Sequence, residues 1–224
     1  PWSPFRLGGG PVKTMAERVA ENADLITKAE APVFVSTPDL LRWVPGAVWC
    51  PVVVDVERWQ AATPEEPRGA RPVVVHAPSS SWLKGTHLVE PILWRLHAEG
   101  VIEYRQIMGV PHREMPEFYA RADIVLDQFN MGIYGVAACE AMASGRLVMS
   151  HVDPYTRGHV ARETGLELPI HEVTPDTVEQ ELRRAAAEPE AFRSYRERGP
   201  SFVRAVHDGR RSAAALAPFL GVSG

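Results

Sequence analysis

Apolar and polar positions form alternating blocks between residues 72 and 150, and these blocks predict strands and helices in turn. Four short apolar runs of the kind found in strands buried on both faces lie at 72–76, 101–107, 124–127 and 147–150. Three segments with apolar residues at helical spacing lie between them, at 86–99, 113–121 and 135–144. Strands that alternate with helices indicate an α/β fold with a doubly wound parallel sheet.

The flanking segments are less regular. Before the alternating blocks, apolar runs at 32–36 and 47–54 predict strands, and 15–23 and the segment from Thr37 predict short helices. Pro, Gly and charged residues at 63–69 are typical of a linker. Helical spacing returns from Pro175 and continues as a last segment over 202–220. We therefore divide the chain into a partial α/β segment, a sheet domain and C-terminal helices, at residues 1–66, 67–200 and 201–224.

Composition narrows the class of protein. The 224 residues correspond to about one and a half domains at roughly 150 residues each. A formal net charge of −4 lacks the basic excess of nucleic-acid-binding proteins, and no apolar run approaches the roughly 18 residues of a membrane span. Two cysteines exclude a disulfide framework and a four-thiolate metal site. The start lacks a signal peptide, so we expect a cytoplasmic protein, and its Pro1-Trp2 opening suggests that a further N-terminal domain precedes it.

The loops that follow the strands are where an open α/β sheet binds ligands. In the third of them, Gly132-Ile133-Tyr134-Gly135 leads directly into a helix that begins with small side chains. A helix start that is open to close approach offers free N–H groups to a phosphate or diphosphate. Glu140 follows Gly135 by about 7.5 Å along the helix, which suits the ribose hydroxyls of a nucleotide bound there. A surface glutamate on a packing helix is the alternative.

The loop after the first predicted strand contains a lysine and three serines. Lys84, at the entrance to the following helix, could offset negative charge on a leaving diphosphate, or could simply be solvated. Ser79 and the two serines after it could donate hydrogen bonds to phosphate, although we favour helix capping. The eight histidines show no tight metal-ligand spacing, so no metal site is expected.

Residues 76–149 resemble the C-terminal, nucleotide-sugar-binding half of a family 4-type (group 1) glycosyltransferase of the GT-B architecture. Three stretches carry the resemblance, and they are Lys84-Gly85-Thr86, the segment His112–Asp123, and Glu140-Ala141-Met142-Ala143-Ser144-Gly145. Their order and spacing match the family. In addition, Val48–Trp59 is similar to the segment that joins the family's two domains, and the helix from Phe202 is similar to the one that crosses back.

The resemblance implies a metal-independent and in most cases retaining transferase, with a Rossmann-like donor domain and no cofactor besides the nucleoside diphosphate-sugar donor. Glu140 would hold the ribose, Lys84 would stabilise the leaving group, and Val110 would lie near the base. The acceptor, whether glycan, lipid or small molecule, would bind mostly to the N-terminal domain. The candidate catalytic residues are Lys84 and Glu140; the candidate donor-binding residues are Ser79, Val110, Gly132, Tyr134, Gly135, Val136, Ala137 and Glu140.

Two positions depart from the family pattern. Gly132 stands where the family usually has a second glutamate that contacts the donor sugar, and Pro78 stands where an arginine usually accompanies the lysine. Tyr134, His76 or Arg157 could replace that arginine. The departures leave two alternatives to a transferase, namely a non-catalytic nucleotide-sugar-binding or assembly module and a GT-B epimerase that acts on the sugar nucleotide.

Overall fold

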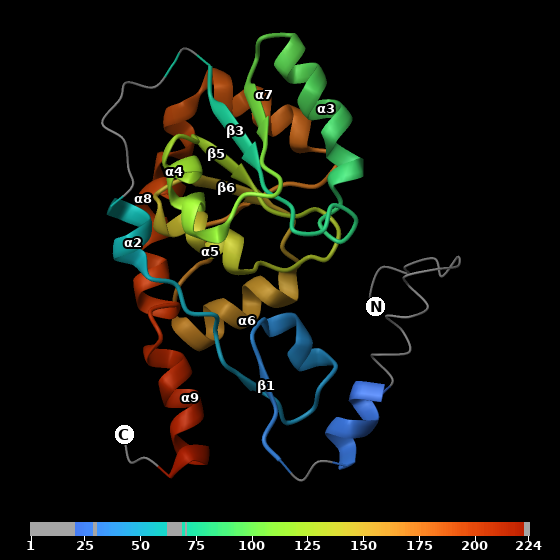
Figure 1. The fold of residues 1–224 in the computed structure, drawn as a ribbon, viewed down its shortest axis with the longest axis vertical. Coiled ribbons are helices and arrows are strands. Elements are labelled where there is room, and N and C mark those ends of the chain that lie inside the picture. The colour runs from blue at the N-terminus through green and yellow to red at the C-terminus, as the bar shows by residue number, and fades with distance from the viewer. Residues whose placement is uncertain (1–20, 29–30, 62–68, 70, 222–224) are drawn as a thin grey trace.

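The computed structural model describes residues 21–28, 31–61, 69 and 71–221, and its centre is a five-stranded parallel sheet (Figure 1). Its strands are β3 (Val73–His76), β4 (Glu103–Gln106), β5 (Ile124–Leu126), β6 (Leu147–Ser150) and β7 (His171–Glu172). They are ordered β4-β3-β5-β6-β7, and every neighbouring pair is parallel. The chain therefore reverses its direction of travel between β3 and β5, which confirms the doubly wound topology and places the switch point between those two strands.

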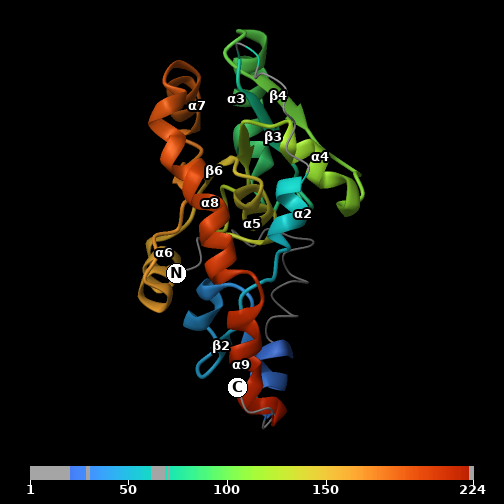
Figure 2. The same ribbon diagram turned by 90° about the vertical axis from the view of Figure 1, so that its left-hand side faces the viewer.

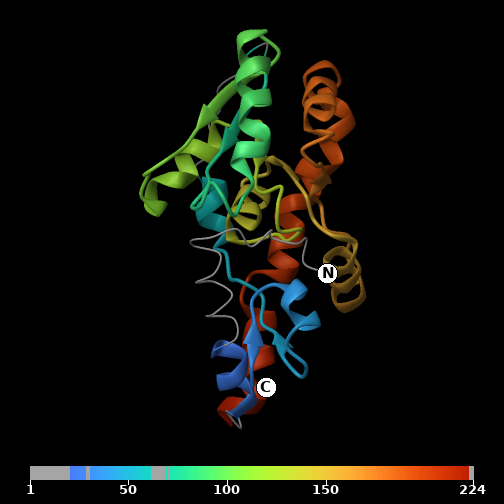
Figure 3. The ribbon, with the colours of Figure 1, turned by 90° about the vertical axis from the view of Figure 1, so that its right-hand side faces the viewer.

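Helices cover both faces of this sheet because its strands are apolar on both sides. One face packs against α3 (Thr86–Ala98) and α7 (Val178–Ala187), which Figure 3 shows in the upper part of the molecule. The other face packs against α2 (Val56–Ala61), α4 (Met115–Ala120), α5 (Val136–Ala143) and α8 (Arg193–Val206). Successive side chains of a strand point to opposite faces of the sheet. Val74 therefore packs in the core on the face of α3 and α7, and Val75 packs in the core on the other face.

The described N-terminal residues form a small second unit. Its elements are β1 (Phe34–Val35), the 3₁₀ helix η1 (Pro38–Arg42) and β2 (Val48–Trp49), which pairs in parallel with β1. Figure 2 shows α9 (Arg210–Leu220) beside this unit, beyond the end of α8. Contacts with the C-terminal helices hold it in place, because Ser212 Oγ donates to the carbonyl of Pro51 at 2.6 Å and Phe34 packs edge-on against Phe219.

The final segment differs from the prediction of one helical stretch over 202–220. Helix α8 ends at Val206 and α9 begins at Arg210. Gly209 between them has φ +98°, in the left-handed region that residues other than glycine rarely adopt. The carbonyl of His207, just before this turn, accepts a hydrogen bond from the backbone N–H of Val54. The prediction of a continuous segment is therefore wrong, because a glycine turn and a contact with the interdomain segment interrupt the helix.

Most of the other predicted elements are confirmed with shorter bounds. The four strands of the sheet domain appear as β3 to β6, and the segment 113–121 becomes a 3₁₀ turn, η2 (His112–Glu114), followed by α4. The apolar run 47–54 supplies only the two residues of β2. Residues 21–28 are helical, while the rest of the predicted 15–23 helix and most of the linker 63–69 lie outside the described residues.

Four elements were not predicted, namely α2, β7, α6 (Pro154–Thr164) and the 3₁₀ helix η3 (Pro189–Phe192). Helix α6 carries few apolar residues, but it has a proline in its first turn and an N-cap, Asp153, whose side chain accepts from the backbone N–H of Thr156. Among the residues described, no helix is both long and apolar enough to cross a bilayer.

Candidate functional site

The topological switch point brings together a lysine and an aspartate from two strand ends. Lys84 lies in the turn between β3 and α3, and Asp127 directly follows β5. Lys84 Nζ forms an ion pair with Asp127 Oδ1, and the side chains are only 14% and 3% exposed. The structure thus places Lys84 at the carboxyl ends of β3 and β5. Its charge is already matched by a buried carboxylate, which the sequence interpretation did not include.

Helix α5 begins beside this pair with an unobstructed N-terminus. Its N-cap, Gly135, has extended backbone and makes no side-chain capping bond, and a Cβ built on it would meet nothing within 4 Å. Val136 is exposed and Ala137 is half-buried. The first N–H groups of a helix have no partner within the helix, so the open space in front of Gly135 leaves them accessible to an anion.

Glu140 lies on the same helix and is buried, with 5% of its surface exposed. His112 Nε2, from the second loop, donates to Glu140 Oε1 at 2.5 Å. Burial raises the pKa of Glu140, while the hydrogen bond from His112 and the charges of Arg58 and Lys84 oppose that rise. The alternative of an exposed surface glutamate is excluded.

Helix α2 supplies a wall beside Glu140 that the sequence did not predict. Trp59 is buried, and its ring lies 5.5 Å from that of Tyr119 and 5.8 Å from that of His112. Arg58, the residue before it, donates a long hydrogen bond of 3.5 Å to the carbonyl of His112. Arg58 and Trp59 of α2 therefore hold the loop that carries His112. In the sequence, the only indication of this contact was the similarity of Val48–Trp59 to the family's joining segment.

The loop before α5 makes a tight turn at Gly132. Its φ is +68°, and a Cβ built there would lie 3.1 Å from Asp153 Cβ and 3.4 Å from His151 Nε2. A side chain at this position would be strained and crowded. Asp153 and His151, which follow β6, occupy the space where such a side chain would lie.

The three residues considered as replacements for the missing arginine all have other partners. The hydroxyl of Tyr134, a buried residue, donates to His207 Nε2 at 3.3 Å. His76 is fully buried between the carbonyl of Leu126 and the hydroxyl of Thr86. Arg157 Nη2 donates to Glu172 and to the carbonyl of Ile170. The side chains of all three are thus engaged within the chain in this arrangement.

The remaining candidates lie on the rim. Ser79 is exposed in the loop after β3, and Val110 is half-buried against the core beside the loop that carries His112. Ser79 does not cap α3, because the N-cap of that helix is Gly85. The favoured reading of the serines as caps is therefore wrong for α3.

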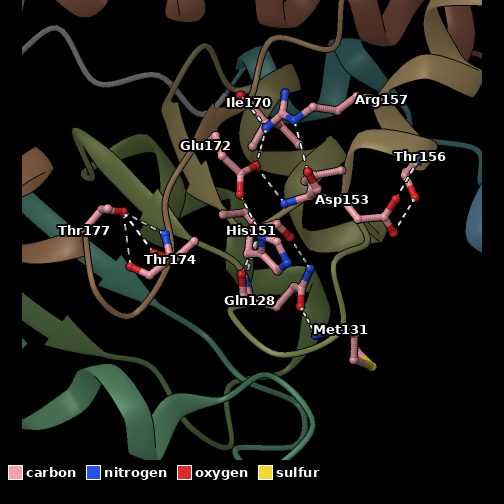
Figure 4. A network of polar contacts seen from close by, with 12 residues as sticks. Gln128, Met131, His151, Asp153, Thr156, Arg157, Ile170, Glu172, Thr174 and Thr177 are labelled. Carbon is pink, nitrogen blue, oxygen red and sulfur yellow. Dashed lines mark hydrogen bonds and ion pairs between the residues drawn. The ribbon is translucent and has the colours of Figure 1, made fainter. Parts of the chain in front are cut away.

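Sequence reasoning missed a polar network behind the Gly132 turn (Figure 4). Gln128 is buried, and its amide nitrogen donates to the carbonyls of Ile133 and His151. His151 Nδ1 in turn donates to Glu172 Oε1 at 2.6 Å. The signal that could have located these residues was position alone, since Gln128 is the second residue after β5 and His151 directly follows β6, both at the carboxyl ends of the strands.

The described residues hold no metal-binding cluster, and two cavities of the structure lie away from the candidate residues. Among the described residues, no group of three His, Cys, Asp or Glu side chains could hold a metal ion. A cavity of about 230 Å³ lies at the opposite edge, beside Pro72, Asp123 and Leu147, and another of about 420 Å³ lies between Trp49 and His159. Neither cavity is lined by Lys84, Gly135 or Glu140, and the space in front of Gly135 is open.

Comparison with known proteins identifies the fold. No protein-family model and no curated protein sequence matches the chain. Among solved structures, it is similar to a sucrose-phosphate synthase from Thermosynechococcus elongatus, with a TM-score of 0.61 and 19% identity over 92% of this chain and 60% of that one. It is also similar to Anabaena HepE in complex with UDP and glucose, with a TM-score of 0.63 and 14% identity over 91% and 66%.

A glycosyltransferase from Rickettsia africae is a third such structure, with a TM-score of 0.57 and 12% identity over 84% of this chain and 62% of that one. The chain thus spans less than two thirds of the length of each of these proteins. It has the Rossmann-like α/β fold found in these GT-B glycosyltransferases.

Proposed function

We propose that this chain is the donor-binding part of a glycosyltransferase that uses a nucleoside diphosphate-sugar. One observation carries the proposal above the others: a buried carboxylate, Glu140, lies inside a helix whose N-terminus is open at the topological switch point. A nucleotide needs both features, one for its ribose hydroxyls and one for its phosphates. The similar structures include a protein with UDP and glucose bound.

In this proposal Glu140 accepts hydrogen bonds from the ribose, and the backbone N–H groups over Gly135–Ala137 hold the diphosphate. Val110, on the neighbouring rim, lies near the base, and Ser79 donates to phosphate. Lys84 supplies positive charge to the leaving group, which requires it to share its interaction with Asp127. We further propose that the transfer is metal-independent and retaining, and that the acceptor binds largely to a separate N-terminal domain.

Binding of UDP to the purified chain, measured by isothermal titration calorimetry, tests the first step. We expect UDP to bind and Glu140→Ala to weaken binding by at least tenfold, because the ribose loses its acceptor. Glu117→Ala is the control, since Glu117 is exposed on α4 and carries no role here. Absence of UDP and GDP binding, or equal affinities for wild type and Glu140→Ala, contradicts the proposal.

A second candidate is a module that binds the nucleotide sugar without transferring it. The crowded left-handed turn at Gly132 favours it, because that backbone does not accommodate the family's second glutamate. Assays of the chain joined to its N-terminal domain separate the two candidates. Release of UDP from UDP-sugars that depends on an acceptor indicates a transferase, whereas UDP binding without any release indicates the module.

A further inference from the structure

A histidine–glutamate pair lies beside the Gly132 turn and has no part in the function proposed so far. His151 follows β6 directly, and its Nδ1 donates to Oε1 of Glu172 on β7 at 2.6 Å. The other ring nitrogen, Nε2, lies 3.4 Å from the place where a Cβ of Gly132 would be. The imidazole therefore turns its second nitrogen toward the loop that leads into α5, and 31% of its side chain is exposed.

Buried polar contacts hold this arrangement together (Figure 4). Gln128 donates to the carbonyls of His151 and Ile133, and its Oε1 accepts from the backbone N–H of Met131 at 2.8 Å. The side chain of Gln128 is 1% exposed. The loop 131–133 and the start of the segment after β6 are thus tied to one buried amide, so the position of His151 relative to the Gly132 turn is fixed.

Glu172 is shared between His151 and Arg157. Its Oε2 accepts from the backbone N–H of Val152 and from Arg157 Nη2, both at 2.9 Å. The groups facing His151 are Glu172 on β7, Arg157 on α6 and Asp153 in its own loop, and Arg42 of η1 pairs with Asp153 at 2.9 Å. Asp39 of η1 also interacts with Asp153 and Arg42, so three cationic groups, counting a protonated His151, face three carboxylates.

The contacts of His151 favour its protonated form. The hydrogen bond to Glu172 raises the pKa of His151, against the effects of burial and of Arg157. Burial works against the charged form of Glu172, but hydrogen bonds from His151, Val152 and Arg157 hold its pKa below the usual value. Lys84, in contrast, is already paired with Asp127.

We propose that His151, oriented by Glu172, donates a hydrogen bond from Nε2 to the terminal phosphate of the nucleoside diphosphate, the phosphate that carries the sugar. This inference rests on the proposed function. Glu140 lies deeper in α5 and the N–H groups lie at its start, so the Gly132 turn before α5 is on the side of the terminal phosphate. When the bond from the sugar carbon to the phosphate oxygen breaks, the electron pair stays on that oxygen, and the imidazolium stabilises the added charge.

A comparison of UDP with UMP by calorimetry isolates this contact, because UMP lacks the terminal phosphate. We expect His151→Gln to weaken UDP binding about tenfold at pH 7 and to leave UMP binding unchanged. His97→Gln is the matched control, since His97 lies at the far end of α3, next to the amino end of β4. Circular dichroism of each variant checks that the chain is folded.

A second variant tests the positioning role of Glu172. In Glu172→Gln the imidazole loses the charge that raises its pKa, so we expect the rise in UDP affinity on acidification to begin at a lower pH than in wild type. The terminal phosphate itself titrates near pH 6, so wild type and both variants are titrated over the same range. His151→Gln is expected to show only the pH dependence of the nucleotide and of Glu140.

The outcomes separate this inference from the function on which it rests. If UDP binds and is weakened by Glu140→Ala, but His151→Gln has wild-type affinity for UDP, the role of His151 is wrong and the proposed function stands. Equal weakening of UDP and UMP by His151→Gln indicates a purely structural role and also overturns the inference. If neither UDP nor GDP binds to the wild-type chain, both proposals fail together.

Discussion

Nε2 of His112 lies 2.5 Å from Oε1 of Glu140, although the histidine side chain is 61% exposed and the glutamate side chain only 7%. The second loop thus places an exposed partner over a buried carboxylate. In the proposed complex, ribose hydroxyls would take over the acceptor that His112 now uses. When no nucleotide is bound, His112 therefore supplies the hydrogen bond that the buried carboxylate of Glu140 requires.

Replacing Glu140 by Gln is expected to separate stability from binding. Burial raises the pKa of Glu140 above its unfolded value, so the charged form costs stability at neutral pH and this cost disappears as the pH falls toward the unfolded pKa. We expect Glu140→Gln to raise the Tm by about 1–3 °C at pH 7.5 and to have less effect at pH 5. Differential scanning calorimetry checks this, and a lower Tm at pH 7.5 contradicts it.

The same variant should bind UDP more weakly, because an amide has only one oxygen to accept from two ribose hydroxyls. Calorimetric titration with UDP measures this effect on the protein whose Tm has been determined. Unchanged UDP affinity together with a raised Tm would mean that Glu140 has no binding role.

The buried pair of Lys84 and Asp127 predicts a strong non-additive effect on stability. Lys84→Met leaves the carboxylate of Asp127, which is 3% exposed, without its partner. We expect a loss of about 3 kcal/mol in the free energy of unfolding, measured with urea. The double variant Lys84→Met/Asp127→Leu should recover most of that loss, because it removes both charges.

Binding by the double variant decides whether Lys84 acts beyond this structural role. If the variant regains stability yet binds UDP more weakly than wild type, Lys84 contributes charge to the diphosphate. A double variant as unstable as Lys84→Met would show that the ion pair does not account for the loss.

Strands β3, β5 and β6 could be predicted because they are buried on both faces and so consist of continuous apolar runs, as at Val73–His76. β7 has only two residues, His171 and Glu172, and both are polar. It is a strand because of its pairing with β6, so no apolar pattern in the sequence could predict it. The break between α8 and α9 at Gly209 could not be predicted, because apolar residues continue at helical spacing on both sides of it. Elements defined by tertiary contacts escape a prediction based on periodicity.

The candidate site shows the same division. Lys84, Gly135 and Glu140 follow from loop position and helix geometry, and the structure brings them to one edge of the sheet. The partners that determine their protonation and charge, Asp127 and His112, come from distant loops, so no local spacing connects them. Asp127 lies 43 residues from Lys84 in the sequence, so nothing local pairs the two.

Close packing of α5 against α8 predicts that a usually favourable substitution is harmful here. A Cβ on Gly199 of α8 would lie 2.7 Å from the backbone carbonyl oxygen of Met142 on α5. Gly→Ala inside a helix usually stabilises by about 0.5–1 kcal/mol, but overpacking costs about 1–3 kcal/mol. We expect Gly199→Ala to lower the free energy of unfolding by about 1–2 kcal/mol, as measured with urea.

Helix α6 offers the matched control for that substitution. A Cβ on Gly158 would meet only the guanidinium end of Arg162, at 3.3 Å, and a flexible side chain can move. Gly158→Ala should therefore be neutral or stabilise by up to about 1 kcal/mol. Equal effects of the two alanines would contradict the close contact between α5 and α8.

His207 predicts how stability depends on pH. Burial lowers the pKa of His207 to about 4, and its Nδ1 donates to the carbonyl of Val52 at 2.8 Å. Between the unfolded pKa near 6.5 and the folded value, the unfolded chain binds more protons, so the free energy of unfolding falls as the pH falls through this window. The expected loss is about 3 kcal/mol, and His76, whose pKa is also lowered by burial, acts in the same direction. Urea unfolding at several pH values between 7 and 4 measures the slope, which should be smaller in His207→Gln; an unchanged slope would show that His207 is not the responsible group.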